Sequence, residues 1–322
     1  MLKIAIVFGG NSVEHEVSVN SAQNVYQNID KNKYDVSLIY VDKNNNFYDV
    51  KDFSLTNKNL ITNLYSLKNY DLIFPVMHGD YFEDGSFQGM LDIFKVKYVG
   101  NNLLTSSLCM DKVYTKKLLD KENIPNVPYL YIYKNYNLDE LNKNISKKIG
   151  YPCFIKPSNC GSSVGTSICY EKSTLEKCIN EALKYDRKVL IEKFIEGKEL
   201  EIAILGNEGL IISDIGEIIS SDIFYTYDAK YNSNSITKVC NSLDKETIDK
   251  IKEYAKEAYK LLECKVLSRI DFFLDKDNNI YLNEINTMPG FTSISMYPML
   301  MKNIGISYTN LINKIIEYSL KK

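Results

Sequence analysis

The sequence is poor in the residues that build zinc centres and disulfide frameworks. It has two histidines, and no two of its seven cysteines form a Cys-x-x-Cys pair. Zinc centres are usually built from histidines and closely spaced cysteines, and disulfide frameworks use an even set of cysteines, so neither kind of site is expected here. An odd number of cysteines without such spacing predicts a reduced, soluble protein of the cytoplasm.

Charge of one sign and long hydrophobic runs are also missing. The formal net charge of −2 at pH 7 gives no electrostatic reason to expect binding to nucleic acid or to an anionic membrane. No run approaches the roughly 18 apolar residues of a membrane-spanning helix. The opening apolar run, residues 4–8, is too short for a secretory signal peptide. The 322 residues, 45% of them hydrophobic, predict an ordinary globular chain of two or three domains.

The first hundred residues alternate between strand and helix patterns. Residues 2–8 predict a buried strand, and the apolar positions from Val19 to Ile29 have helical spacing. Strands are then predicted over 34–42 and 72–77, and a helix over 87–94. Strands that alternate with helices in this way predict a parallel sheet.

Polar residues follow two of these predicted strands. Glu14 and His15 come after the first strand and His78 after the strand 72–77, so both histidines of the chain lie in strand-end loops. Ligands bind at the carboxyl ends of parallel strands, which favours a binding site there. A structural role for an acid at a helix start remains open, because it complements the helix dipole. The glycines Gly9 and Gly10 do not form a G-x-G-x-x-G motif, so a dinucleotide site has little support.

A loop of small residues, 158–165, joins two predicted strands in the middle of the chain, and Lys156 ends the first of them. It is not a Walker loop, because Gly-Lys-Ser/Thr is absent and no helix follows. The backbone N–H groups and hydroxyls of such a loop can surround phosphate oxygens, with Lys156 beside them as a positive charge. A flexible hairpin would have a similar composition.

Further helices are predicted along the rest of the chain. They cover 111–119, a stretch from a capping box at Ser173 to about Lys184, the amphipathic segment 244–263 and a final helix from about Ser307. The polar, aromatic segment 224–237 has no clear periodicity and is interpreted as a lid.

The most informative stretch is a predicted β-hairpin made of residues 268–275 and 279–286. If its loop consists of the four residues 276–279, Asp271 lies opposite Glu284 and Arg269 lies opposite Asn286, all on one face. A slip of one residue would scatter these side chains.

Two opposed carboxylates repel each other unless a cation lies between them. Mg²⁺ accepts carboxylate oxygens together with phosphate oxygens, so Asp271, Glu284 and the amide oxygen of Asn286 form a candidate magnesium site. A solvated strand face with scattered charges is the alternative at this point.

Six motifs in a fixed order make the chain resemble the D-alanine–D-alanine ligases of the ATP-grasp superfamily. They are GGNSVEHEVS (9–18), HGDYFEDGSFQG (78–89), KPSNCGSSVG (156–165), FYTYDAKY (224–231), RIDFF (269–273) and NEINTMPGFTSIS (283–295). The resemblance extends from Lys3 to about Pro298.

The resemblance implies an α/β protein with the ATP-grasp fold. It has a parallel-sheet substrate domain (1–100), a central domain (101–192) and a C-terminal catalytic domain with a lid loop (193–322), and the last two clasp ATP. The implied reaction is the phosphorylation of one D-alanine by ATP, followed by attack of the amine of a second D-alanine on the acyl phosphate. The dipeptide would serve peptidoglycan synthesis.

The resemblance also implies roles for individual residues. Lys112, Lys156, Ser162 and Ser163 would contact the phosphates, and Glu192 and Glu199 the adenine and ribose. Asp271, Glu284 and Asn286 would bind two Mg²⁺ or Mn²⁺ ions. Glu14 and His78 would bind the first D-alanine, and Lys230, Ser295 and Met296 the second. Arg269 and Gly290 would form the oxyanion hole, and Tyr231 would link Ser162 to Glu14 when the lid closes.

Three positions depart from the family pattern: Phe82 and Met288 replace the usual small residues, and Cys160 lies in the 158–165 loop. A homodimer formed through the first domain is implied by the resemblance alone. The alternatives are a ligase that takes D-serine or D-lactate as its second substrate, a carboxylate–amine ligase with other substrates, and a nucleotide-binding relative without turnover. Tyr231 favours the dipeptide-forming type, and the last alternative predicts the loss of a metal ligand or of Arg269, which this sequence keeps.

Overall fold

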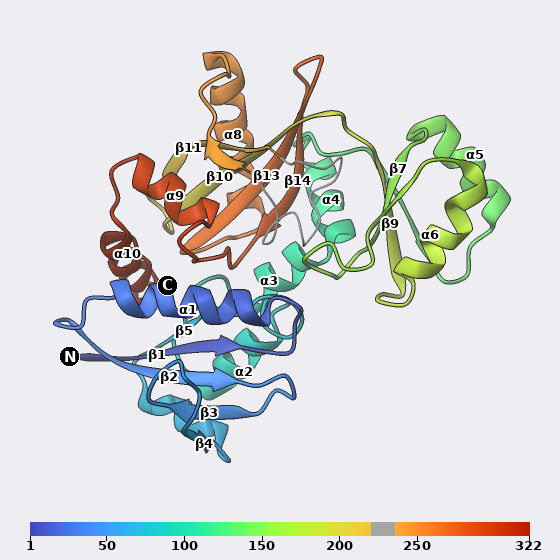
Figure 1. The fold of residues 1–322 in the computed structure, drawn as a ribbon. Helices are drawn as coiled ribbons and strands as arrows, with labels where there is room; N and C mark the ends of the chain where they lie inside the picture. The colour runs from blue at the N-terminus through green and yellow to red at the C-terminus, as the bar shows by residue number, and fades with distance from the viewer. Residues whose placement is uncertain (220–235) are drawn as a thin grey trace.

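The computed structural model describes residues 1–219 and 236–322, which form three β-sheets with helices packed on them. Figure 1 shows them as three lobes, with the first sheet at the bottom, the second at the right and the third at the top. Lys230, Tyr231 and nearly all of the expected lid lie outside the described residues. No helix in the two described ranges combines the length and the hydrophobicity of a membrane span.

The helices pack on both faces of the first sheet and on the other two sheets. The α-helices of the described ranges are α1 (His15–Asn28), α2 (Ser86–Phe94), α3 (Leu103–Met110), α4 (Lys112–Lys121), α5 (Leu138–Lys148), α6 (Leu175–Ala182), α8 (Lys245–Leu261), α9 (Met296–Asn303) and α10 (Tyr308–Leu320). Short 3-10 helices are η1 (Leu64–Asn69) and η2 (Lys172–Thr174). Of the α-helices, α3, α5 and α9 were not predicted.

The first sheet contains the predicted parallel strands and an antiparallel edge. Across the sheet its strands are β4 (Lys58–Leu60), β3 (Phe47–Val50), β2 (Tyr34–Val41), β1 (Leu2–Gly9) and β5 (Leu72–Pro75). β1 pairs in parallel with β2 and β5, which confirms the prediction. β3 and β4 were not predicted, and they extend the sheet in the antiparallel sense.

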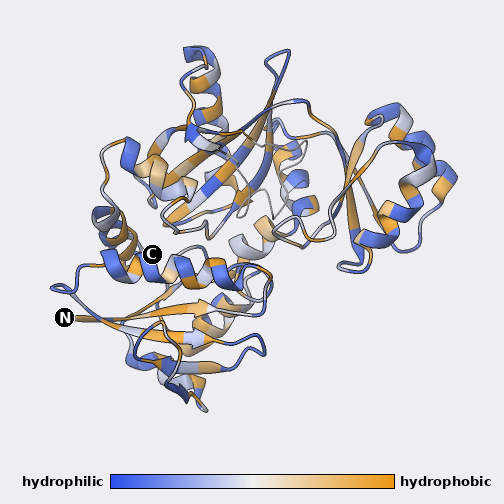
Figure 2. Cartoon of the chain, viewed as in Figure 1, coloured by the Kyte–Doolittle hydropathy of each residue, from blue (hydrophilic) through white to orange (hydrophobic). Residues whose placement is uncertain are grey.

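Side chains of β1 alternate between two cores, which explains its unbroken apolar sequence. Ile4 and Phe8 pack in a core shared with α1, α9 and α10, whereas Ala5 and Val7 pack in a core shared with α2. Figure 2 shows β1 and β2 as hydrophobic along most of their lengths. Because α10 belongs to the first of these cores, the end of the described chain packs against the sheet with which it begins.

The second and third sheets are antiparallel. The second has the strands β6 (Tyr129–Tyr133), β9 (Lys188–Lys193), β7 (Cys153–Pro157) and β8 (Ser167–Cys169), and its core includes side chains of α5 and α6. The third has the strands β12 (Ile236–Val239), β11 (Ile211–Ile219), β10 (Gly197–Leu205), β13 (Leu267–Asp275) and β14 (Ile280–Asn286). The helix α8 packs its predicted apolar face on the third sheet through Ile251, Ala255 and Ala258.

The β13–β14 hairpin has the predicted pairs of polar residues, but its register near the turn differs from the predicted one. Asp271 lies opposite Glu284, and Arg269 lies opposite Asn286. Near the turn, however, Leu274 pairs with Ile280, so the register there is one residue away from the predicted one. The ladder shifts between Leu282 and Glu284, which makes Asn283 the extra residue of a β-bulge. The bulge restores the register that brings the four polar residues together.

The capping-box prediction was wrong. The turn of 3-10 helix η2 precedes α6, whose N-cap residue Thr174 makes no side-chain capping bond. The hydroxyl of Ser173 donates instead to the carboxylate of Glu171 at 2.5 Å, and Thr174 Oγ1 donates to the carbonyl oxygen of Glu171. Local side-chain bonds thus compete with the helix cap.

A buried asparagine ties the end of the first sheet to the third. The amide nitrogen of Asn101 donates to the carbonyl oxygens of Leu267 and Thr287, at 2.9 and 3.1 Å, and its oxygen accepts from the N–H of Lys265 at 2.7 Å. Leu267 begins β13 and Thr287 follows β14. One side chain therefore binds backbone groups of both strands at the open end of the hairpin.

We expect Asn101→Ala to lower the free energy of unfolding by at least about 2 kcal/mol, because each buried backbone group left without a partner costs about 1–3 kcal/mol. The neighbouring Asn102 caps α3 by accepting from the N–H of Thr105 at 2.8 Å, and Asn102→Ala should cost about 1 kcal/mol. Chemical denaturation of both variants measures the difference. A loss for Asn101→Ala no larger than for Asn102→Ala would contradict this assignment.

Candidate active site

Two adjacent cavities lie where the three sheets meet. The first cavity, of about 280 Å³, is lined by the N-cap residue of α1, by the loop after β5, and by β13, β14 and the residues that follow them. The second cavity, of about 360 Å³, lies between the second and third sheets. Residues that line both are Lys112, Gly161, Ser162, Ile218 and Glu284. The two cavities therefore meet at a lysine, a carboxylate and a small-residue loop.

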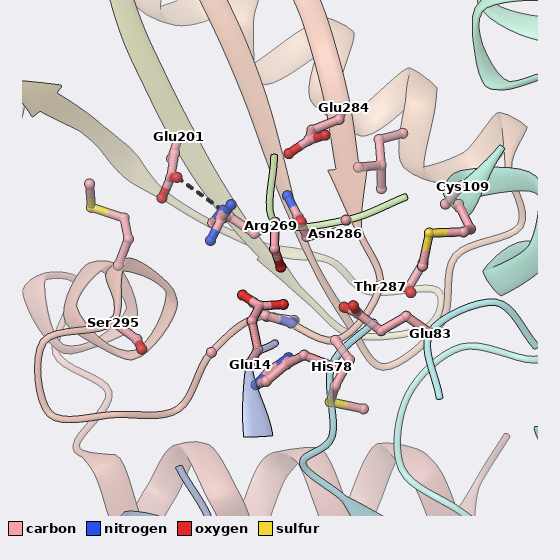
Figure 3. A pocket seen from close by; sticks show the side chains of 18 of the residues that line it. Glu14, His78, Glu83, Cys109, Glu201, Arg269, Glu284, Asn286, Thr287 and Ser295 are labelled. Carbon is pink, nitrogen blue, oxygen red and sulfur yellow. Dashed lines mark ion pairs between the residues drawn. The ribbon is translucent and has the colours of Figure 1, made fainter. Parts of the chain in front are cut away.

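Most of the predicted substrate residues line the first cavity. These are Glu14, His78, Ser162, Arg269, Gly290, Ser295 and Met296. Figure 3 shows Glu14 and His78 facing the same space as Arg269, Glu284 and Asn286. The other histidine, His15, does not line either cavity, since its Nδ1 contacts the carbonyl oxygen of Gly10 and its Nε2 the hydroxyl of Tyr40.

Arg269 is the positive centre of the first cavity. Its Nε and Nη2 donate to the two carboxylate oxygens of Asp271, at 2.8 and 2.7 Å. Its Nε also lies 3.2 Å from a carboxylate oxygen of Glu201, as the dashed line in Figure 3 marks. Burial alone would lower the pKa of Arg269, but Asp271 and Glu201 outweigh it and raise that pKa. The guanidinium therefore stays charged.

The three predicted metal ligands differ in their surroundings. Asp271 is buried and lines neither cavity, and it also accepts from the side-chain amide of Asn286 at 2.9 Å. Glu284 lines both cavities, and one of its oxygens lies 3.8 Å from Lys112 Nζ. Within residues 1–219 and 236–322 no group of three or more histidine, cysteine, aspartate and glutamate side chains is arranged to hold a metal ion. The expected set has only two carboxylates, with the amide of Asn286 as its third member.

That donor set suits Mg²⁺, which prefers one or two carboxylates and takes its remaining ligands from water and substrate oxygens. Asp271 Oδ2 accepts hydrogen bonds from both Arg269 and Asn286, whereas Oδ1 accepts only from Arg269 and keeps its second lone pair for a cation. The donor types present therefore fit a small divalent cation, and Glu284 is the member of the set that lies where the two cavities meet.

Residues predicted to contact the nucleotide and an aromatic pair line the second cavity. Lys112, Lys156, Ser162, Ser163 and Glu199 are the predicted members. Two consecutive residues of the 158–165 loop, Ser162 and Ser163, have left-handed backbone conformations, with φ of 53° and 58°. Residues other than glycine rarely adopt this conformation. The rings of Phe154 and Phe194, both lining residues, stack at 5.4 Å. The cavity thus offers positive charge at one place and a flat apolar wall at another.

Glu192 does not line either cavity, although adenine contact was predicted for it. It is buried between Lys116 and Lys156, whose ammonium nitrogens lie 2.6 and 2.7 Å from its oxygens. Burial alone would raise the pKa of Glu192, but these two lysines lower it to about 2. The carboxylate of Glu192, which is not itself a lining residue, therefore orients Lys156, which lines the second cavity. Lys116 was missed by sequence reasoning, because its partner lies far away in the chain.

Glu83 and Glu201 are further acidic residues of the first cavity that sequence reasoning did not assign. Glu83 accepts from the N–H of Gly79 at 2.6 Å, and burial together with nearby Glu14 raises its pKa to about 8. Burial likewise lowers the pKa of His78. The first cavity thus carries an uncharged carboxyl group and an uncharged imidazole at neutral pH, beside the charged Arg269.

Phe82 and Met288, which depart from the family pattern, pack their large side chains into hydrophobic cores. Phe82 is buried against Phe87, with ring centroids 5.6 Å apart, and lies so close to Gly10 that a Cβ there would approach the ring to 2.9 Å. Met288 is buried in the core that includes β1 and would come within 2.8 Å of a Cβ at Gly100. Each large side chain fills space beside a glycine.

Cys160 lines the second cavity, and burial raises the pKa of its thiol to about 11. Because the thiolate is the reactive form, this cysteine is protected from modification at neutral pH.

The chain matches known ligases in both sequence and structure. Residues 3–101 match the family described as "D-ala D-ala ligase N-terminus", and residues 118–317 match "D-ala D-ala ligase C-terminus". A D-alanine–D-alanine ligase from Clostridium acetobutylicum is 43% identical, over 99% of this chain and 98% of its own. One from Caldicellulosiruptor bescii is 43% identical, over 100% of this chain and 96% of its own.

Solved structures give the same overall arrangement. The VanG D-Ala:D-Ser ligase from Enterococcus faecalis is 36% identical, with a TM-score of 0.88 over 99% of each chain. The D-alanine–D-alanine ligase from Bacillus anthracis complexed with ATP is 30% identical, with a TM-score of 0.81 over 100% of this chain and 98% of its own.

We expect Glu192→Gln to lower the free energy of unfolding at pH 7 by about 3–5 kcal/mol, because it leaves two buried lysines without their counter-charge. A carboxyl whose pKa falls on folding stabilises the native state above its unfolded pKa, and that stabilisation is lost as the pH falls. The gap between wild type and variant should therefore shrink between pH 4.5 and about 2.

Urea denaturation at a series of pH values measures both effects. Glu196→Gln is the matched control, since Glu196 forms an exposed ion pair with Lys276 at 2.7 Å, and its loss should cost less than about 1 kcal/mol. Equal losses for the two variants would show that Glu192 has no special role.

Proposed function

This chain belongs to the D-alanine–D-alanine ligase family, and from that membership we propose how its two cavities carry out the family's reaction. Its three-sheet architecture is the ATP-grasp fold. The activity is ATP-dependent ligation of two D-alanines to D-alanyl-D-alanine, with ADP and phosphate as the other products. We assign the dipeptide to peptidoglycan precursor synthesis.

One observation supports this division of labour above the others: Lys112, Ser162 and Glu284 line both cavities. A reaction that passes a phosphoryl group from a nucleotide to a carboxylate needs two binding sites that meet at the transferred group. The second cavity takes ATP, with the adenine beside Phe154 and Phe194 and the ribose at Glu199. The first cavity takes the two D-alanines.

Lys112 and Lys156 neutralise the phosphates, and the loop of Ser162 and Ser163 covers them. Glu192 holds Lys156 charged and in place, since it pairs with this lysine at 2.7 Å and raises the lysine pKa against the effect of burial. In this proposal Glu192, which lines neither cavity, supports the nucleotide site through Lys156, and its contact with adenine rests on the family pattern alone.

Asp271, Glu284 and Asn286 would hold two Mg²⁺ or Mn²⁺ ions, which supply positive charge for the phosphoryl group as it moves between oxygens. The protein's own residues orient the reacting groups. Glu284 lies where the two cavities meet, and Arg269 holds the buried carboxylate of Asp271 in place through two hydrogen bonds.

The amino acids are bound by opposite ends of the first cavity. Glu14 pairs with the ammonium of the first D-alanine, and His78 lies beside that D-alanine. Ser295 and Met296 bind near the carboxylate of the second, together with Lys230.

Arg269 and the backbone N–H of Gly290 stabilise the oxyanion that forms when the second amine attacks. Tyr231 closes the site by linking Ser162 and Glu14. The roles of Lys230 and Tyr231 come from the family pattern alone.

We further propose the domain division 1–100, 101–192 and 193–322, in which each unit contains one sheet. A homodimer through the first domain is supported by the exposed side chain of Ile93 of α2, and by the exposed Leu103 and Leu104 of α3, the adjacent helix that begins the second unit. Exposed apolar groups of this kind mark protein interfaces when they lie together. A cytoplasmic location agrees with seven cysteines that are all free.

A D-serine acceptor is the second candidate, because the solved D-Ala:D-Ser ligase is 36% identical to this chain. The acceptor is chosen near Lys230, Tyr231 and Ser295 in the family pattern, and only Ser295 lies in the described part of the chain. Its hydroxyl accepts from the N–H of Thr292 at 3.0 Å.

The first experiment measures ADP release with ATP, Mg²⁺ and D-alanine, with L-alanine as the control and D-serine or D-lactate as competing acceptors. We expect brisk release only with D-alanine, and D-alanyl-D-alanine as the main product. A mixed product rich in D-serine would move the assignment to the second candidate. Nucleotide binding without release would contradict both.

We expect Glu284→Gln to lower kcat by about 100-fold or more, because a carboxylate that binds the cations contributes several kcal/mol to stabilising charge in the transition state. Asp277→Asn, in the exposed turn of the same hairpin, should retain the wild-type rate. Steady-state rates at several Mg²⁺ concentrations measure the effect. A near-normal rate for Glu284→Gln at limiting Mg²⁺ would exclude Glu284 as a cation ligand.

A further inference from the structure

Three residues far apart in the sequence form a buried cluster beside the second cavity. Asp111 is the N-cap residue of α4, Ser158 follows β7, and Lys188 begins β9. All three are buried, and Ser158 and Asp111 line neither cavity. We call these three residues the Asp111 cluster.

Side-chain bonds hold the cluster together. The hydroxyl of Ser158 donates to Asp111 Oδ1 at 2.7 Å and accepts from the N–H of Val113 at 3.3 Å. The ammonium of Lys188 donates to Asp111 Oδ2. Burial alone would raise the pKa of Asp111, but its bonds with Lys188 and Ser158 lower it, so the carboxylate is ionised.

Backbone bonds complete the cluster at Ser158. Its N–H donates to the carbonyl oxygen of Lys188 and its carbonyl oxygen accepts from the N–H of Lys112, both at 3.0 Å. The backbone N–H, the carbonyl and the hydroxyl of Ser158 are thus all bonded within the protein. Ser158 begins the loop that is proposed to cover the phosphates, and its bonds fix the start of that loop in place.

Two phosphate-binding elements start from this cluster. Lys112 is the residue after Asp111, and its ammonium crosses to the loop, where it donates to the carbonyl oxygen of Cys160 at 2.8 Å. The loop itself continues from Ser158 to Ser162 and Ser163, which line the second cavity. The next loop residue, Asn159, is held by Asp186, which accepts from its N–H at 2.9 Å.

We infer that Asp111 is a positioning residue for the nucleotide: by binding Ser158 and Lys188 it holds Lys112 and the 158–165 loop in one arrangement around the phosphates. The inference rests on the assignment of ATP to the second cavity. Asp111 itself touches no substrate in this scheme. Loss of the cluster releases the lysine and the loop together, so it weakens nucleotide binding, whereas the residues proposed to bind the D-alanines, Glu14, His78, Ser295 and Met296, lie on other segments of the chain.

The test compares Asp111→Asn and Ser158→Ala with wild type in the full chain. Asp111→Asn keeps an oxygen that can accept from Ser158 but removes the charge that pairs with Lys188. We expect the KM for ATP to rise about tenfold, which corresponds to ~1.4 kcal/mol. The KM for D-alanine should stay within about twofold of wild type. Ser158→Ala should raise the KM for ATP in the same direction.

The matched control is Asp120→Asn, on the same helix. Asp120 accepts hydrogen bonds from the side chains of Asn126 and Tyr129, at 2.7 and 2.9 Å, and neither of these partners belongs to the 158–165 loop. This variant should retain the wild-type KM for ATP. Thermal unfolding of each variant shows how much stability it has lost.

Calorimetric titration with ADP and Mg²⁺ gives a second measurement that needs no turnover, and the Kd should rise by the same factor as the KM. A merely structural role would lower the melting temperature and the active fraction with unchanged KM and Kd, and that result would overturn the inference. A wild-type protein that binds ADP but shows no ligation would overturn the proposed function, whereas the Kd values would still decide the role of Asp111.

Discussion

The attraction of one guanidinium for several buried carboxylates organises the site. Arg269 donates to Asp271 and contacts Glu201, while Glu14, Glu83 and Glu284 line the same cavity. A low-dielectric site cannot hold so many anions unless cations or protons balance them. Glu83 already illustrates the second solution, since burial and Glu14 raise its pKa to about 8. A site of this composition is short of positive charge, and divalent ions would supply it.

The helix α4 organises the nucleotide side of the site in a comparable way. Lys112 and Lys116 are four residues apart and therefore lie on the same side of the helix. Lys112 reaches the loop and Glu284, while Lys116 reaches Glu192, which in turn holds Lys156. One helix thus carries Lys112 and also, through Lys116 and Glu192, helps to position Lys156 of β7. Its own position is set by the buried carboxylate of its N-cap residue, Asp111.

Local patterns in the sequence were sufficient to predict the strands of the first sheet that pair in parallel, helix α8 and the polar face of the hairpin. They were insufficient wherever a partner is distant. The role of Lys116 depends on Glu192, 76 residues further along the chain. The role of Glu201 depends on two residues of the neighbouring strand β13, Asp271, which lies opposite it, and Arg269, which it contacts. The capping box at Ser173 failed because a nearby acid, Glu171, competed for the hydroxyl. Family resemblance supplied the individual roles, which patterning alone could not reach.

The bulge at Asn283 has a consequence for how this hairpin can change over evolution. Between the turn and the bulge the two strands are paired one residue out of step with the rest of the ladder, and the extra residue absorbs that difference. A hairpin one residue shorter, without the bulge, would still place Asp271 opposite Glu284. The length of the tip is thereby uncoupled from the chemistry at its base. A change of one residue in the length of the hairpin can thus be taken up at the bulge while the four polar residues keep their places.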